Sequence, residues 1–173
     1  MAVPKVYLRP IENSDVSRYH SWLQDSEVTK FLEARFTVWT EDKVRQYIRE
    51  NPYLFAVCVY SKELEVYHLH AGNIKLGNIN WIHKLADIGL MIGDKTLWRK
   101  SICTEAISLI TKYAFEVLGL HKVTAGCYAE NIWAISAFQK AGFQIEGVLK
   151  NHYLFESKYT DAVILGKRLS EIL

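Results

Sequence analysis

The polar residues best placed to do chemistry lie in the stretch GDKTLWRKSICTEA, residues 93–106. It follows an apolar, strand-like run (88–92) and leads into a helix-like run (104–110). Such a junction binds anions readily, because the first N–H groups of a helix are unpaired and its dipole is positive there. Phosphate loops are usually rich in glycine, whereas this one has Arg99 and Ser101 at its centre. The stretch is therefore either a phosphate-binding loop with altered residues or an ordinary connection.

Histidine and cysteine, which commonly bind transition metals, are few and scattered. His68 and His70 form an H-x-H pair on one side of an expected strand, but no acid or cysteine stands at a fitting local spacing. We therefore predict no metal site. Cys58, Cys103 and Cys127 are odd in number and lie in apolar or strand-to-helix surroundings, which predicts buried reduced thiols in a cytoplasmic protein.

Composition limits the class of protein. The chain has 173 residues, half of them apolar, which suits a single domain (1–173) with a substantial core. Its 21 basic and 19 acidic residues leave a formal net charge of +2, so we expect no nucleic acid and no membrane as partner. No apolar run approaches the length of a membrane span, and the first residues lack the apolar segment of a secretory signal.

The periodicity of apolar residues predicts the elements that position these groups. We expect a first strand at 6–10, helices that begin near Asn13 or Ser14 and at Thr40, and three strands at 53–60, 70–81 and 87–93. A helix (102–118) stopped by Gly119, a strand (122–128), a helix (131–141) closed by Gly142 and a hairpin (143–169) follow. This order gives a mixed α/β fold with a partly antiparallel sheet.

A resemblance to a known family rests on two blocks at a fixed spacing. The first is ADIGLMIG (86–93) with the loop that follows it, and the second is AENIWAISAFQKAGF (129–143). Together they resemble the GNAT superfamily of acetyl-CoA-dependent N-acetyltransferases, over nearly the whole chain. In that family a fourth strand leads into a loop of pattern Q/R-x-x-G-x-G/A and a helix. The continuation FQIEGVL (143–149), followed by a tyrosine, looks most like the branch that contains the ribosomal-protein N-terminal acetyltransferases.

The resemblance implies a mostly antiparallel sheet of about seven strands with helices on both faces. Strands four and five would splay apart, and acetyl-CoA would bind there as co-substrate, with no metal. The implied contacts come from the fourth strand, the loop with the helix start, and the helix after strand five. They are Leu90, Met91, Ile92, Trp98, Arg99, Lys100, Ser101, Ile102, Cys103, Asn131, Phe138 and Lys140. Asn131 could equally serve as the N-cap of its helix, and the two roles are compatible.

The loop departs from the family pattern. Trp98, Ser101 and Cys103 stand where the family usually has Gln or Arg, Gly, and Gly or Ala. A serine at positive φ would cost about 1 kcal/mol. A charge-assisted contact from Arg99 to the pyrophosphate would be worth more, on the order of 1.5–3 kcal/mol. We therefore expect Arg99 or Lys100 to contact phosphate; the alternative is that both point to solvent.

The proton donor also departs from the pattern. Phe138 stands where many members have a tyrosine that protonates the leaving thiolate. Phenylalanine has no proton to give, so another group or solvent must do it. Tyr128, Tyr153 and Cys127 are the candidate substitutes, and the sequence does not rank them.

Acetyl transfer also needs a group that takes the proton of the attacking amine. Asp87 is our first choice for base or amine holder; the alternative is a strand-edge residue that faces solvent. Glu33, in the segment FLEARFTVW (31–39), is the second choice, because this segment lines the acceptor cleft in the family; the alternative is a solvated loop carboxylate. Four further residues are candidates for binding the acceptor: Arg35, Trp39, Asn80 and Trp81. For Trp39 the alternative is a role in a local core.

The predicted reaction is acetyl transfer from acetyl-CoA to a primary amine by direct attack in a ternary complex. The aromatic and amide side chains suit a small acceptor such as an amino sugar. The branch resemblance favours a protein N-terminus instead. A third hypothesis is a catalytically weak or inactive acyl-CoA-binding module. Edge strands near the C-terminal hairpin could also pair in a homodimer.

Overall fold

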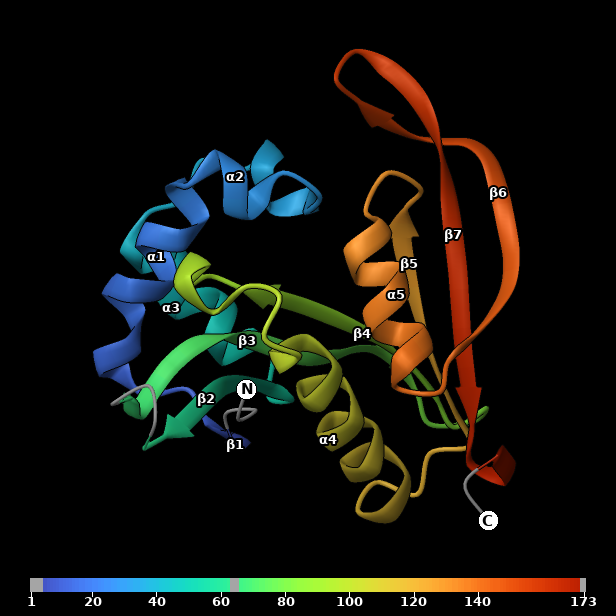
Figure 1. Cartoon of the computed structure of the whole chain (residues 1–173), viewed down its shortest axis with the longest axis horizontal. Helices are drawn as coiled ribbons and strands as arrows, with labels where there is room; N and C mark the ends of the chain where they lie inside the picture. Colours follow the sequence, from blue (N-terminus) through green and yellow to red (C-terminus); the bar gives the residue numbers. More distant parts are fainter. Residues whose placement is uncertain (1–4, 63–65, 172–173) are drawn as a thin grey trace. The chain divides into compact units, whose positions relative to one another are not determined.

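The computed structural model describes residues 5–62 and 66–171. Its strands are β1 (Lys5–Pro10), β2 (Leu54–Ser61), β3 (Val66–Asn80), β4 (Leu85–Ile92), β5 (Lys122–Tyr128), β6 (Gln144–Phe155) and β7 (Lys158–Arg168). They form one seven-stranded sheet in the order β1-β2-β3-β4-β5-β7-β6 (Figure 1). The pair β4–β5 is parallel, whereas β1–β2, β2–β3, β5–β7 and β6–β7 are antiparallel. The predicted mixed α/β fold with a mostly antiparallel sheet is confirmed.

The chain divides into two compact units. The first contains the residues up to Lys75 and 90–106, and the second contains 76–89 and the residues from 107 onward. Strands β3 and β4 each pass from one unit into the other. The prediction of a single domain over 1–173 remains a prediction.

The first unit packs three helices, α1 (Val16–Gln24), α2 (Ser26–Thr29) and α3 (Glu41–Glu50), with strands β1 and β2. Helix α1 carries the predicted apolar face, because its apolar residues recur every three to four positions. The predicted cap at Asn13 or Ser14 is wrong, because Asn13–Asp15 form a 3₁₀ turn and Asp15 is the N-cap of α1. Thr40 caps α3 by accepting a hydrogen bond from the Lys43 N–H at 3.3 Å. The apolar core of this unit comprises Val16, Tyr19, Trp22, Leu23, Val28, Val44, Leu54 and Met91.

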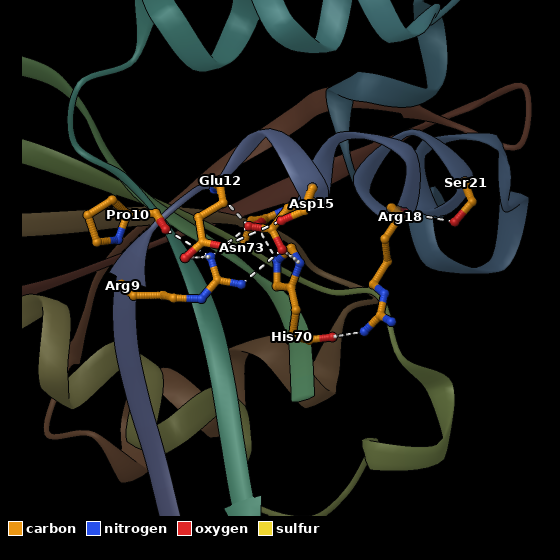
Figure 2. Close-up of polar contacts among 9 residues, drawn as sticks. Arg9, Pro10, Glu12, Asp15, Arg18, Ser21, His70 and Asn73 are labelled. Atoms are coloured by element: carbon orange, nitrogen blue, oxygen red, sulfur yellow. Dashed lines mark hydrogen bonds and ion pairs between the residues drawn. The ribbon is translucent and has the colours of Figure 1, made fainter. Parts of the chain in front are cut away.

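A buried polar network joins β1, the start of α1 and β3 inside the first unit (Figure 2). The Arg9 guanidinium donates two hydrogen bonds to the Asp15 carboxylate, at 2.6 and 2.9 Å. His70 Nδ1 lies 3.1 Å from Asp15 Oδ1, and His70 Nε2 lies 2.8 Å from the Asn73 side-chain amide. Both Asp15 and His70 are buried, so the Arg9–Asp15 ion pair and the close approach of His70 to Asp15 tie the three elements together.

The prediction that His68 and His70 lie on one side of a strand is wrong. His68 has φ +53°, which breaks the alternation of side chains along β3. As a result His70 is buried, while His68 is exposed and its Nδ1 lies 2.8 Å from the Tyr7 hydroxyl. Among the described residues, no group of three or more His, Cys, Asp or Glu side chains is arranged to hold a metal ion.

In the second unit, β5 pairs with β7 along its full length, and β7 pairs in turn with β6. The parallel pairing of β4 with β5 covers Leu85–Asp87 and 122–124. Strand β4 nevertheless continues to Ile92 and β5 to Tyr128. The paired segment is therefore short.

The helices predicted after the fourth and fifth strands are both present. Helix α4 (Ile102–Glu116) begins in the first unit and continues in the second, and α5 (Ile132–Lys140) belongs to the second. Gly119 has φ +63° and ends the α4 segment, with the Leu120 N–H bonded to the Ala114 carbonyl. No helix of the described residues is long and apolar enough to cross a membrane.

Candidate active site

The loop after β4 is fixed at both ends inside the first unit. The Trp98 indole N–H donates to the Ile92 carbonyl at 2.9 Å, which ties the loop to the end of its strand. Asp94 Oδ1 accepts hydrogen bonds from the Thr96 backbone N–H and hydroxyl. Lys95 forms ion pairs with Asp25 and Glu27, both at 2.9 Å. The loop is therefore held by side-chain contacts to the end of β4, within itself, and to Asp25 and Glu27.

The backbone at the centre of the loop adopts the conformation that glycine usually provides. Arg99 has φ +64° and Ser101 has φ +61°. Both residues are exposed, Lys100 is half-buried, and α4 starts at the next residue, the buried Ile102. The left-handed residues thus stand immediately before free helical N–H groups, the arrangement of a backbone anion nest.

The end of β4 lies very close to β3. A Cβ on Gly72 would lie 2.1 Å from the Met91 carbonyl oxygen, so only glycine fits there. A Cβ on Gly93 would overlap the buried Trp22 ring, at 2.0 Å. The side chains of Met91 and Ile92 are buried, and Leu90 is half-buried. The predicted strand edge is therefore backed by tight packing, a requirement that the sequence did not reveal.

The predicted base, Asp87, lies on β4 in the second unit. Its Oδ2 accepts a hydrogen bond from Asn78 Nδ2 at 2.9 Å. Its Oδ1 is buried and has no hydrogen-bond partner. Asn78 adopts φ +46°, an irregularity in β3 that brings its amide to the carboxylate. A half-buried carboxylate with one unsatisfied oxygen is suited to accept a proton or hold an amine.

The candidate proton donors lie around β5. Tyr128 is buried, and its ring stacks on that of Tyr153 with centroids 4.3 Å apart. Burial raises the pKa of the Cys127 thiol to about 12. Cys103, at the start of α4 in the first unit, is half-buried, and burial raises its pKa to about 11. Neither thiol is therefore ionised near neutral pH.

The α5 residues have structural roles. Asn131 Oδ1 accepts a hydrogen bond from the Ala134 N–H at 3.2 Å, so the N-cap role is present. Phe138 is buried and packs edge-on against Phe143, with centroids 5.1 Å apart. Lys140 is exposed. The proposed contacts of these residues with acetyl-CoA remain predictions.

The predicted acceptor residues fall into two groups. In the first unit, Glu33 and Arg35 lie in a 3₁₀ turn, and the Arg35 guanidinium lies 4.6 Å from the Phe36 ring. Trp39 packs against the core of this unit and donates its indole N–H to the Ala34 carbonyl at 2.9 Å, as the core alternative expected. In the second unit, Asn80 Oδ1 accepts two backbone N–H groups of the β3–β4 turn, beside the exposed Trp81.

The sequence of residues 5–144 matches the family model described as an acetyltransferase (GNAT) domain. Because this match covers most of the 173 residues, the chain belongs to the GNAT acetyltransferase family. The predictions of a GNAT fold and of an acyltransferase are confirmed.

Two curated relatives illustrate the family. The spermidine N(1)-acetyltransferase of Escherichia coli (strain K12) is 26% identical over 163 residues, which cover 91% of this chain and 83% of the relative. The probable N-acetyltransferase YjcK of Bacillus subtilis (strain 168) is 27% identical over 174 residues, 93% of this chain and 92% of the relative. The first of these acts on spermidine by its name, so the resemblance to the ribosomal-protein branch is unconfirmed.

Solved structures show the same fold. Spermidine N-acetyltransferase from Vibrio cholerae, in complex with CoA and spermine, has a TM-score of 0.80 and 20% identity, covering 95% of this chain and 96% of that one. A GNAT-family acetyltransferase from Bacillus anthracis has a TM-score of 0.79 and 22% identity, covering 96% of each chain. A dodecameric structure of the Vibrio enzyme has a TM-score of 0.75 and 20% identity, covering 97% of this chain and 96% of that one.

Proposed function

We propose that this protein transfers the acetyl group of acetyl-CoA to a primary amine of a small molecule by direct attack in a ternary complex. One observation carries the proposal beyond family membership. The loop keeps left-handed backbone at Arg99 and Ser101, immediately before the N-terminus of α4. This is the backbone geometry that a pyrophosphate needs, although the glycines that normally provide it are absent.

The donor would be held mainly by backbone groups and one or two cations. The N–H groups at the start of α4 bind the pyrophosphate, and Arg99 adds a charged contact. The backbone of 90–92 pairs with the amides of the pantetheine arm as an added strand would. This accounts for the tight packing behind β4, because a rigid strand edge loses little entropy when it binds.

Asp87 would act on the amine. A neutral amine nitrogen attacks the thioester carbonyl, a C–N bond forms and the C–S bond breaks. Asp87 accepts the proton that the amine loses, directly or through one water. Asn78 holds the carboxylate by its Oδ2 and leaves Oδ1 for the proton. The thiolate of CoA then takes a proton from an acid.

For the acceptor, we propose a polyamine in preference to the amino sugar expected from composition. The curated relative named for spermidine aligns over 83% of its length. A partly unpaired carboxylate such as Asp87 complements a cationic chain better than it complements an uncharged hydroxyl-rich ring. The protein N-terminus, favoured by the branch resemblance, is the second acceptor class.

Calorimetric titration with acetyl-CoA, followed by an acceptor panel, tests this proposal. The panel contains spermidine, glucosamine and a peptide with a free N-terminus, and product is measured by mass spectrometry. We expect binding of acetyl-CoA and the highest kcat/KM for spermidine. No binding at millimolar acetyl-CoA would overturn the proposal. Binding without transfer to any amine would instead support the inactive acyl-CoA-binding module.

A further inference from the structure

The reaction leaves a thiolate, and the usual tyrosine is absent. Phe138 stands in its place, is 4% exposed, and is fixed by its edge-on contact with Phe143. The three substitutes named from the sequence, Tyr128, Tyr153 and Cys127, all belong to the second unit. The strand register decides between them.

The face of the sheet that carries Asp87 is defined by its pairing with Thr124 on β5. Paired residues of neighbouring strands point to the same side of a sheet, and side chains alternate along each strand. Thr124, Gly126 and Tyr128 therefore share the face of Asp87, and Cys127 lies on the opposite face. Its thiol, with a pKa of about 12, is buried there. Cys127 is thus excluded as the acid.

Of the two tyrosines, Tyr153 places its hydroxyl over this face. A Cβ built on Gly126 would lie 3.2 Å from Tyr153 Oη, so the hydroxyl occupies the space that the missing side chain leaves. Gly126 itself is exposed. Tyr128, in contrast, is 4% exposed and lies beneath the Tyr153 ring, with interplanar angle 23°. Tyr128 therefore supports the Tyr153 ring, whose hydroxyl lies over Gly126.

A bulge in β6 aims this ring. Residues 150–152 of β6 stand opposite the single residue Asp161 of β7, between the pairs Leu149–Ala162 and Tyr153–Thr160. Asn151 has φ +50°, and its N–H donates to Asp161 Oδ1 at 3.0 Å. Lys150 Nζ contacts Asp161 Oδ2 at 2.8 Å. Bulges commonly redirect a side chain next to a functional site, and here Tyr153 is the first residue after the bulge.

We propose that Tyr153 is the general acid that protonates the leaving thiolate, in place of the missing tyrosine at position 138. This inference rests on the proposed function. The C–S bond breaks, its electron pair stays on sulfur, and the sulfur takes the proton of the Tyr153 hydroxyl. The amine proton goes to Asp87, and exchange with solvent restores both groups.

The spacing of the two groups suits this division of roles. Gly126 is one strand across and two residues along from Asp87, a separation of about 8 Å between Cα atoms from standard strand geometry. The carboxylate and the hydroxyl lie over the same face of the sheet, so the reacting atoms can lie between them.

The test compares the variants Tyr153→Phe, Tyr128→Phe and Tyr159→Phe. The measurements are kcat, the pH profile of kcat, and the affinity for acetyl-CoA by calorimetry. For Tyr153→Phe we expect kcat to fall about 10²- to 10⁴-fold, with the affinity unchanged. In the wild type, deprotonation of the acid should make kcat fall at high pH. We expect this fall to be absent in Tyr153→Phe. Tyr159→Phe, at a tyrosine that is 70% exposed on β7, is the matched control and should behave as wild type.

The outcomes separate the two proposals. A wild-type protein that binds no acetyl-CoA or acetylates no amine would overturn the proposed function and this inference together. An active wild type with an equally active Y153F variant would overturn the assignment of Tyr153 alone. So would a Tyr128→Phe variant that loses the high-pH decline while Y153F keeps it.

Discussion

One oxygen of the Asp87 carboxylate accepts a hydrogen bond from Asn78, and the other is buried without a partner. An amide at this position keeps the shape but cannot take a proton. We therefore expect Asp87→Asn to lower kcat/KM near neutral pH by about 10²- to 10⁴-fold. Asn78→Ala, which removes only the orienting hydrogen bond, should cost less. Equal rates for Asp87→Asn and wild type would remove Asp87 from the mechanism.

His70 is the residue whose ionisation should matter most for stability. Burial, outweighing its polar contacts, lowers the pKa of His70 below 6.5. The folded protein therefore holds fewer protons than the unfolded chain once the pH drops below about 6.5. The stability that neutral His70 provides is present above this value and is lost as pH falls through its folded-state pKa. Arg9, Asp15 and Asn73 are the polar groups that face it.

Protonation of Asp15 should cause a second loss of stability at lower pH. Burial alone would raise its pKa, but the Arg9 hydrogen bond, the Glu12 N–H and nearby His70 together lower it below 3.8. We expect the urea midpoint to decrease from pH 7 to pH 5, and again below pH 4. His70→Gln should be less stable by about 1–3 kcal/mol at pH 7 and should flatten the first step. If the variant kept the wild-type slope between pH 7 and 5, another group would be responsible.

At the scale of elements, the loop before α4 replaces glycine flexibility with side-chain contacts and a charge. If Arg99 contacts the pyrophosphate, Arg99→Gly should weaken acetyl-CoA binding about tenfold to hundredfold. Ser101→Gly relieves a left-handed serine without changing charge. It should leave the affinity unchanged and raise the free energy of unfolding by no more than about 1 kcal/mol. Calorimetric titration and thermal unfolding of both variants distinguish charge from backbone strain. An unchanged affinity in Arg99→Gly would contradict the charge explanation.

The elements with local signals could be predicted from the sequence. The periodic apolar face of α1, the Gly119 stop and the Asn131 cap depend on neighbours within one or two turns. The bulge that aims Tyr153 could not be predicted, because Asp161 of another strand holds it. The split of His68 from His70 likewise depends on a distant partner, Tyr7. Sequence periodicity does not report such long-range contacts, and they shape the candidate site.

At the scale of the whole molecule, the predicted homodimer remains a prediction. Strand β6 ends the order of the sheet and carries exposed apolar side chains. These are Ile145, Val148, Leu149 and Leu154. An exposed edge of this kind favours pairing with another chain.

The two compact units should unfold together, as the single-domain prediction requires. Strands β3 and β4 run without interruption from one unit into the other, so unfolding either unit frays two strands of its neighbour. Scanning calorimetry should give one transition whose calorimetric and van't Hoff enthalpies agree. Val44→Ala in the first unit and Leu165→Ala in the second remove fully buried side-chain atoms, and each should lower the same Tm. Two transitions, with each variant shifting only the one of its own unit, would show instead that the chain folds as two domains.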